Sequence, residues 1–377
     1  MRIRTALILA ARLVWSLGVV VAGGYGTANA EAWAASDAGD VQRRAEAGDA
    51  EAQRKLGVMH GTGDGVPKDL ATALEALTKA AEQGEAYAQH ALGWMYSEGD
   101  GVPKNPAKAV EWYTKAAEQG HAEAQFNLGA GYAIGSGVPK DSAKAMEWYT
   151  KAAEQGHAEA QFNLGARYAI GAGVPKDSAK AVEWFTKAAE QGHATAQHIL
   201  GAMYAAGDGV PKDSVKAVEW YTKAAEQGHA EAQADLGVMY ATGDGVPKNS
   251  AKAMEWYTKA AEQGHAKAQR FLGWMYSEGD GVPKDSAKAV EWLTKAAEQG
   301  DERAQGKLGV MYATGDGVPK DDVRAYSWAN LAAATGLDAA KRLRDLLEER
   351  MTRDQIAEAQ RLSAAFKPKP QRPEPEQ

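Results

Sequence analysis

A Val-Pro pair recurs along this chain at a fixed interval of 36 residues. Its prolines are Pro67, Pro103, Pro139, Pro175, Pro211, Pro247, Pro283 and Pro319, and a Leu-Gly pair repeats in the same step. Eight units without insertion or deletion therefore fill the middle of the chain, at residues 49–84, 85–120, 121–156, 157–192, 193–228, 229–264, 265–300 and 301–336. Self-similarity at this period is typical of solenoids, in which each unit buries its apolar surface against its neighbours.

Each unit contains the pattern of two helices. In the unit 121–156, a first helix is predicted over 122–134 and ends at Gly135, a residue that readily adopts the left-handed conformation. A loop rich in glycine and proline follows, and Asp141 then caps a second helix over 142–155. We therefore predict an all-α fold, a right-handed α/α solenoid of eight 36-residue helix-turn-helix repeats with helical caps.

The two ends of the chain depart from the repeat. Residues 1–30 are predicted to be a signal peptide, with Arg2 and Arg4, an apolar run and a cleavage site at Ala28-Asn29-Ala30. Residues 31–48 are expected to form an N-terminal cap and 337–366 a C-terminal helical cap, before a disordered proline-rich tail at 367–377. Export by a cleavable signal peptide indicates a periplasmic protein, with secretion beyond the cell as the alternative.

Composition excludes several classes of function. The 377 residues include no cysteine, so disulfides, thiolate metal sites and cysteine nucleophiles are absent. A net charge of −7 argues against a general nucleic-acid binder, which needs a basic surface. Histidines recur at the start of the first helices, where we expect them to cap the helix instead of binding metal. We therefore predict no enzyme, no catalytic or metal-binding residue and no cofactor.

One motif in each unit carries a family resemblance. The pattern Ala-x-Ala-Gln-x-x-Leu-Gly-x-x-Tyr, then Gly-Val-Pro-Lys-Asp and Trp-Tyr-x-Lys-Ala-Ala-Glu-Gln-Gly, resembles the Sel1-like repeat (SLR) of the tetratricopeptide superfamily, in its exported bacterial type. The resemblance implies a scaffold or adaptor that binds proteins, often in the bacterial periplasm. Some cysteine-rich members are associated with penicillin binding. A peptidoglycan-binding, penicillin-binding or β-lactamase-like activity, or a secreted host-interaction factor, therefore remains an alternative.

Comparison of the eight units with one another indicates where a partner would bind. When a unit is numbered from 1 at its first residue, positions 2, 5, 8, 9 and 12 barely change and share one side of the first helix. Positions 3, 6, 7, 10 and 14 vary and share the opposite stripe, which is rich in the residue types of interface hot spots. Arg167, at position 11, is added to this stripe. The predicted partner-binding residues are therefore Tyr87, His90, Trp94, Phe126, Phe162, Arg167, Ile170, His198, Arg270, Phe271 and Trp274.

We expect this stripe to line the concave face of the solenoid and to bind an envelope or host protein. The alternative is that its members pack between adjacent first helices. A tryptophan row in the second helices, from Trp112 to Trp328, and a tyrosine row from Tyr96 to Tyr312 are assigned to core packing. The protein is further expected to be a monomer, without nucleic acid and without stable membrane insertion after signal cleavage.

Overall fold

The computed structural model of the chain describes residues 35–369 and confirms an all-α repeat solenoid. These residues form nineteen helices and no strand. The described residues divide into two compact units, one of residues 35–199 and 208–210, the other of residues 200–207 and 211–369. The predicted signal peptide and residues 370–377 of the predicted tail lie outside the described residues.

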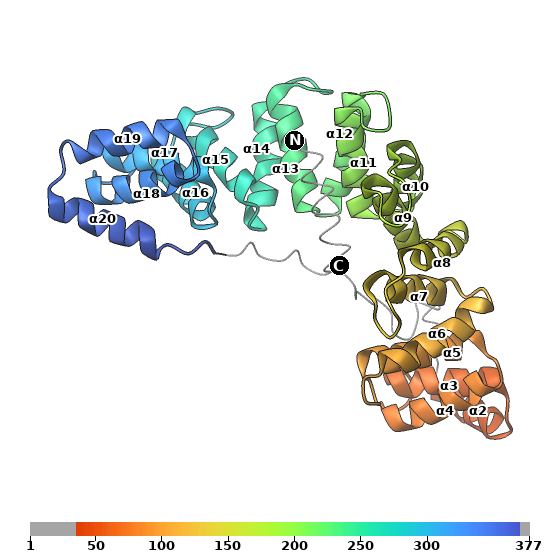
Figure 1. Cartoon of the computed structure of the whole chain (residues 1–377). Helices are drawn as coiled ribbons and strands as arrows, with labels where there is room; N and C mark the ends of the chain where they lie inside the picture. The colour runs from red at the N-terminus through yellow and green to blue at the C-terminus, as the bar shows by residue number, and fades with distance from the viewer. Residues whose placement is uncertain (1–34, 370–377) are drawn as a thin grey trace. The chain divides into compact units, whose positions relative to one another are not determined.

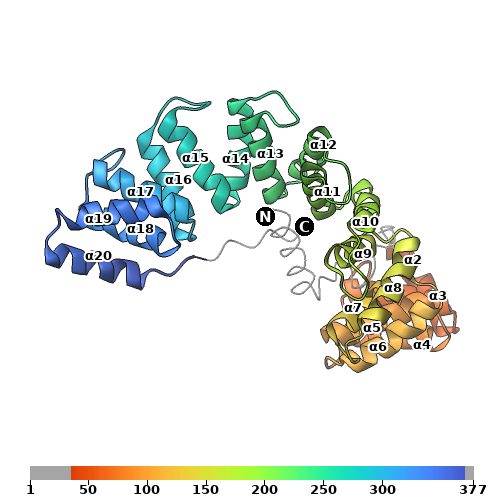
Figure 2. The same cartoon turned by 45° about the horizontal axis from the view of Figure 1, so that its top comes forward.

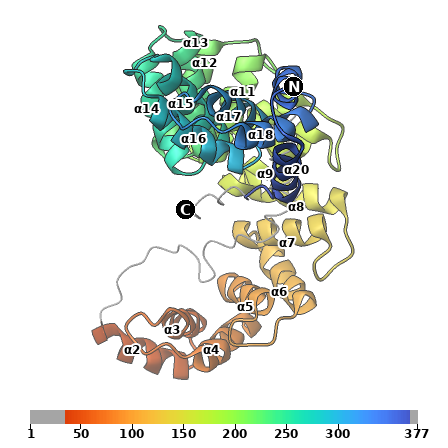
Figure 3. The same ribbon diagram turned by 90° about the vertical axis from the view of Figure 1, so that its left-hand side faces the viewer.

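The first unit begins with a single helix and continues as antiparallel helix pairs (Figure 3). Its helices are α2 (Ala35–Glu46), α3 (Ala50–Thr62), α4 (Leu70–Glu82), α5 (Ala86–Glu98), α6 (Pro106–Glu118), α7 (Ala122–Ile134), α8 (Ser142–Glu154), α9 (Ala158–Ile170) and α10 (Ser178–Glu190). The next helix, α11 (Ala194–Ala206), contains the boundary between the units.

The second unit repeats the same helix pair and ends with two further helices, as Figures 1 and 2 show. Its helices are α12 (Ser214–Glu226), α13 (Ala230–Thr242), α14 (Ser250–Glu262), α15 (Ala266–Glu278), α16 (Ser286–Glu298), α17 (Glu302–Thr314), α18 (Asp322–Ala334), α19 (Asp338–Glu348) and α20 (Arg353–Ala365). In both units the odd-numbered helices from α3 to α17 are the first helices of the repeats, and the even-numbered helices from α4 to α18 are the second helices.

The local signals in the sequence explain where these helices begin and end. The Asp141 carboxylate accepts hydrogen bonds from the backbone N–H groups of Ala143 and Lys144, both at 3.0 Å, and so caps α8. Gly135 ends α7 with φ of 80°, in the left-handed region that favours glycine. The observed bounds of α7 and α8 agree with the prediction to within one residue.

The two helices of a repeat touch through a glycine at position 9. A Cβ atom added to Gly93 would lie 2.5 Å from the buried ring of Tyr113, which is closer than carbon atoms pack. Buried alanines complete the contact on α6, and Ala116 and Ala117 are at most 1% exposed. The core thus consists of small residues that let helices approach closely, with larger side chains filling the remaining space.

A buried glutamine at position 5 of the first helix bonds to two second helices in repeats such as the third. In the third repeat, the Gln125 amide donates to the carbonyl of Ala117 at 3.1 Å, at the end of the preceding second helix. Its own side-chain oxygen accepts from the Gln155 amide at 2.7 Å. These bonds satisfy both ends of a buried amide and explain why this polar residue belongs to the packed face.

The tryptophan and tyrosine rows lie at the edge of the core. Trp148 is half-buried against the cluster that contains Ala124 and Leu128, and the Lys151 ammonium lies 4.0 Å from its ring centroid. Tyr132 is half-buried in the same way, with the Lys144 ammonium 5.1 Å from its ring. Both rows therefore pack against the core, as predicted, and lysine side chains cover their outer faces.

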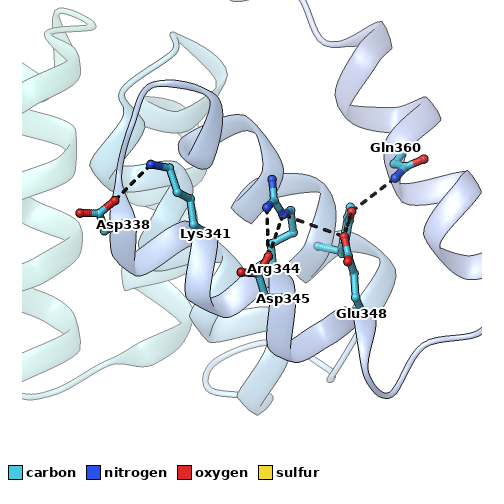
Figure 4. Close-up of polar contacts among 7 residues, drawn as sticks. Asp338, Lys341, Arg344, Asp345, Glu348 and Gln360 are labelled. Atoms are coloured by element: carbon cyan, nitrogen blue, oxygen red, sulfur yellow. Dashed lines mark hydrogen bonds and ion pairs between the residues drawn. The ribbon is translucent and has the colours of Figure 1, made fainter.

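The C-terminal cap is a helix pair held by polar contacts. A capping box begins α20, in which the side chains of Thr352 and Gln355 each accept a hydrogen bond from the other's backbone N–H. Figure 4 shows the charged face of α19, where Lys341 pairs with Asp338 at 3.1 Å and Arg344 with Asp345 at 2.9 Å. These side chains give the last turn of the solenoid a polar outer surface.

Candidate functional site

The structure separates the eleven predicted partner-binding residues into two groups. Five are buried, with exposed fractions of 8% or less: His90, Phe162, Arg167, His198 and Arg270. The prediction that they belong to an open stripe is therefore wrong, because a side chain without accessible surface cannot meet a partner. The other six are half-buried or exposed: Tyr87, Trp94, Phe126, Ile170, Phe271 and Trp274. We call these six the first-helix surface.

Position 6 of each first helix points toward the next repeat. The Phe126 ring stacks on His157 with centroids 4.8 Å apart, and the Phe162 ring stacks on His193 at 4.5 Å. Each of these histidines is position 1 of the following repeat. The variable residue at position 6 is therefore part of the junction between successive repeats, as the packing alternative expected.

Two junctions use an ion pair in place of stacked rings. The Arg270 guanidinium lies 3.0 Å from the Asp301 carboxylate, and both side chains are at most 10% exposed. Arg54 and Glu85 form the equivalent pair at 3.5 Å. The sequence contained this signal, because position 1 is acidic in the two repeats that follow an arginine at position 6.

The recurrent histidines at position 1 cap the first helices, which confirms their predicted role. The Nδ1 atom of His157 accepts from the backbone N–H of Ala160 at 3.2 Å, so the neutral ring carries its proton on Nε2. That Nε2 atom lies 2.9 Å from the Glu123 carboxylate of the preceding repeat. Among the described residues, no group of three or more potential ligands is placed to hold a metal ion.

Packing at the junction between repeats changes the pKa values of His90 and Glu123. Burial lowers the pKa of His90 to about 3, because the charged ring would lose its water and lies 4.8 Å from the ring of His121. Burial is the largest single influence on Glu123 and raises its pKa, but the hydrogen bond from His157 and the charges of His157, His90 and His121 together outweigh burial, so the pKa is lowered overall. These shifts follow from packing between repeats, which removes water from the histidine and glutamate side chains.

In the first unit, the first-helix surface is built on these junctions. The Tyr87 ring meets His121 edge-on with centroids 5.7 Å apart, and the Arg54 guanidinium lies 5.0 Å from the Tyr87 centroid. Trp94 packs partly against the core, and Ile170 is 40% exposed at the end of α9. Aromatic and aliphatic side chains that are held by neighbours yet keep one open side are suited to binding another protein.

In the second unit, an aromatic cluster occupies α15. Phe271 stacks on Tyr257 with centroids 4.9 Å apart and meets Trp274 edge-on at 5.9 Å. The buried Arg270 guanidinium lies 4.5 Å from the Phe271 ring and 4.8 Å from the Trp274 ring. Because Arg270 is fixed by Asp301, the two half-buried rings are held in place before any partner arrives.

The repeats match a known family model over most of the chain. The model described as Sel1 repeat matches residues 50–85, 86–121, 122–157, 158–193, 194–229, 230–265, 266–301 and 303–337. A comparison with curated proteins found no match to this chain. Within the described residues, no helix has both the length and the apolar character needed to cross a membrane.

Two solved structures extend the comparison to the fold. A protective antigen of uropathogenic Escherichia coli strains with an SLR fold is 33% identical, with 97% of this chain and 93% of that chain covered and a TM-score of 0.51. A Sel1 repeat protein of Oxalobacter formigenes is 37% identical, with 82% and 89% covered and a TM-score of 0.62. Proteins of this kind generally act as scaffolds for protein–protein interaction and are typically non-catalytic. The chain belongs to the Sel1 repeat family.

Proposed function

We propose that this protein is a non-enzymatic adaptor of the bacterial cell envelope, which binds a partner protein through the first-helix surface. The observation that carries the proposal is the aromatic cluster on α15, where Arg270 holds the half-buried rings of Phe271 and Trp274 in a fixed arrangement. Aromatic side chains contribute most of the binding energy in many interfaces, above all where they are ordered in advance. The envelope location rests on the predicted signal peptide at residues 1–30.

The partner segment is expected to be apolar at its centre. Tyr87 and Trp94 offer aromatic edges in the first unit, and Phe271 and Trp274 do so in the second. Each unit would therefore present its own aromatic contact to a partner.

Affinity capture from an envelope extract tests the proposal. The bait is the chain from Glu31 onward, compared with a variant that carries alanine at Tyr87, Trp94, Phe271 and Trp274. The proposal predicts a protein that is retained by the wild type and lost from the variant, while circular dichroism shows equal helix content. Capture of the same proteins by both baits would show that the first-helix surface is not the binding site.

A further inference from the structure

The junction between the second and third repeats brings two histidine rings face to face. His90, at position 6 of α5, is 1% exposed, and its ring stacks on His121, the cap of α7, with centroids 4.8 Å apart. At the next two junctions, Phe126 and Phe162 take the place of His90 and stack on the following cap histidine. The junction of the second and third repeats therefore holds two titratable rings where these two junctions hold one.

Hydrogen bonds hold both rings in the neutral form. The Nε2 atom of His90 lies 3.1 Å from the side-chain Nδ2 atom of Asn127, which can only donate, so His90 accepts there and carries its proton on Nδ1. The Nδ1 atom of His121 accepts from the backbone N–H of Ala124 at 3.2 Å, so this ring carries its proton on Nε2. A second proton on either ring would therefore remove the acceptor of an existing hydrogen bond. The buried Nδ1 atom of His90 finds no hydrogen-bond partner among the described residues, so nothing at this atom would stabilise a charged ring.

Two tyrosines enclose the pair of rings. Tyr87 of α5 meets both rings edge-on, with its centroid 6.4 Å from that of His90 and 5.7 Å from that of His121. Tyr113 of α6 lies 5.7 Å from His90. Burial raises the pKa of both tyrosines, so neither side chain supplies a negative charge that would favour a charged histidine.

The carboxylate that acts on both rings is already bonded to another histidine. The negative charge of Glu123 in α7 favours a charged ring at His90 and at His121, whereas His157, the cap of α9, disfavours it. The Glu123 carboxylate, however, lies 2.9 Å from His157 and forms its hydrogen bond there. Glu123 is position 3 of its repeat, and the residue at position 3 before His121 is Tyr87. His121 therefore lacks the acid that holds His157.

We infer that this junction is an acid-sensitive hinge: when His90 takes up a second proton, the two rings repel, α6 and α7 part, and residues 35–120 separate from the repeats that follow. In a solenoid each repeat contacts only its neighbours, so one junction can open while the others stay closed. The surfaces that part include Ala124 of α7, which is fully buried in a cluster with Ala116 and Ala117 of α6.

The pH range of the hinge follows from His90. In the closed junction, burial and then the neighbouring His121 lower the pKa of His90 to about 3, against 6.5 for a ring in water. Between these values the open junction binds the additional proton, so the closed junction is fully favoured above pH 6.5 and is progressively disfavoured as the pH falls toward 3. At pH 5 the equilibrium between the two forms has shifted toward the open form by about 30-fold relative to pH 7.5. Burial also lowers the pKa of His121, which acts in the same direction.

Thiol labelling in the full chain tests the hinge, because the natural sequence contains no cysteine. A124C places a thiol in the buried contact between α6 and α7, and A160C places one at the same position of the next repeat, against α8. The disulfide reagent 4,4′-dithiodipyridine, which reacts with thiols in acid as well as at neutral pH, reaches either thiol only when its junction opens. The hinge predicts that the labelling rate of A124C, divided by that of A160C, rises by about 30-fold from pH 7.5 to pH 5.

The variant H90F identifies the group responsible, because it gives this junction the phenylalanine of the next two. In the A124C background it should limit the rise to about threefold or less, while circular dichroism shows constant helix content. Hydrogen exchange of the wild type and of H90F needs no cysteine and is the second readout. The amides of α5 and α6 should lose about 30-fold of protection at pH 5 in the wild type and keep it in H90F. An unchanged ratio of A124C to A160C, an equal rise in H90F, or a loss of helix content in parallel with labelling would each overturn the inference.

Discussion

Single residues in this chain are most constrained where two helices approach each other closely. A Cβ atom added to Gly93 would collide with the tyrosine ring of its partner helix. The same relation holds at position 9 of the other repeats as far as Gly273, where the opposing side chain is Tyr, Phe or Leu. Gly131 is also helical, but the nearest atoms to an added Cβ lie 3.4 Å and more away. The two glycines therefore have different physical roles, although both lie in first helices.

G93A is expected to destabilise the protein by about 1–3 kcal/mol, because the new methyl group must displace the buried Tyr113 ring. G131A serves as the matched control and should be neutral or stabilising by up to about 1 kcal/mol, since alanine is the better helix former. Urea unfolding followed by circular dichroism measures both. A G93A variant as stable as G131A would show that the helices do not approach as closely as described.

The ionisation of His90 predicts a dependence of stability on pH. Its pKa of about 3 in the folded chain is below the value of 6.5 in an unfolded chain, so between these limits the unfolded state binds the additional proton. The contribution of the neutral His90 side chain to the free energy of unfolding is therefore fully present above pH 6.5, and it is lost as the pH decreases toward 3. By pH 5 the loss from this residue is about 2 kcal/mol.

The variant H90F isolates this contribution, because phenylalanine occupies the same position in the next two repeats. We expect the thermal midpoint of the wild type to decrease more than that of H90F between pH 7.5 and pH 5. His121 and Glu123 are present in both proteins and interact electrostatically with His90, so the comparison measures His90 together with these interactions. Parallel decreases in the two proteins would mean that His90 is accessible to protons in the folded state.

At the scale of helices and their contacts, the junction between repeats depends on two residues, one at position 6 and one at position 1 of the next repeat. These two residues change together from one repeat to another. Arg270 and Asp301 form one version, and Phe162 with His193 forms another. Asp301 also caps α17 by accepting from the backbone N–H of Ala304 at 2.9 Å, which the histidine Nδ1 does in other repeats. Both versions therefore combine a cap with a contact to the preceding repeat.

R270A is expected to destabilise the protein by about 3 kcal/mol, because it leaves the buried Asp301 carboxylate without its cation. The double variant R270F/D301H converts the junction to the ring-stacked version and should regain most of that loss. The single variants R270F and D301H, together with R270F/D301H and the wild type, form a cycle in which unfolding measures the coupling. If the double variant loses as much stability as its two single variants lose in sum, the ion pair and the stacked rings are not interchangeable.

The sequence predicted the helices well because their signals are local. Gly135 and Asp141 determine the end of one helix and the beginning of the next through their own backbone and side-chain bonds, without help from distant residues. The exposure of the predicted partner-binding residues was predicted less well. The position of a side chain around its own helix does not show which residues of the neighbouring repeat will contact it. The His90 and Phe162 rings lie between the second helix of their own repeat, at Tyr113 and Phe185, and the first residue of the next repeat, and contacts on both sides bury them.

At the scale of the whole molecule, a solenoid needs a cover at its last repeat. Ala325, Ala329 and Ala332 of α18 are fully buried, and α19 and α20 supply part of the surface that buries this helix. The Asn330 amide also donates to the Ser363 hydroxyl at 2.9 Å. The two final helices thus take the place of a ninth repeat.

Truncation after Gly336 is expected to lower the thermal midpoint and to cause association, because the apolar face of α18 becomes exposed to water. Truncation after Phe366 is the control, since it retains both cap helices and removes only the segment from Lys367. Differential scanning calorimetry and size-exclusion chromatography measure the two effects. If both truncated chains melt and elute like the full chain, α19 and α20 are not a cap.

The repeat and its solenoid were predictable from one sequence because the period itself contains the information. The candidate binding surface was predictable only in part, because exposure depends on how neighbouring repeats pack. Phe271 and Trp274 remain on the surface, whereas Arg270 beside them is buried by its pairing with Asp301. The residues that determine which protein binds lie partly in the sequence of the partner.

The affinity of the captured partner for W274A tests the central claim most directly. The control is V215A, which removes an apolar side chain that is 57% exposed on the second helix α12. We predict that W274A weakens binding by about 30-fold, as suits the loss of a hot-spot tryptophan, while V215A leaves the dissociation constant within about twofold. Equal affinities of wild type and W274A, with helix content unchanged, would contradict binding through the first-helix surface.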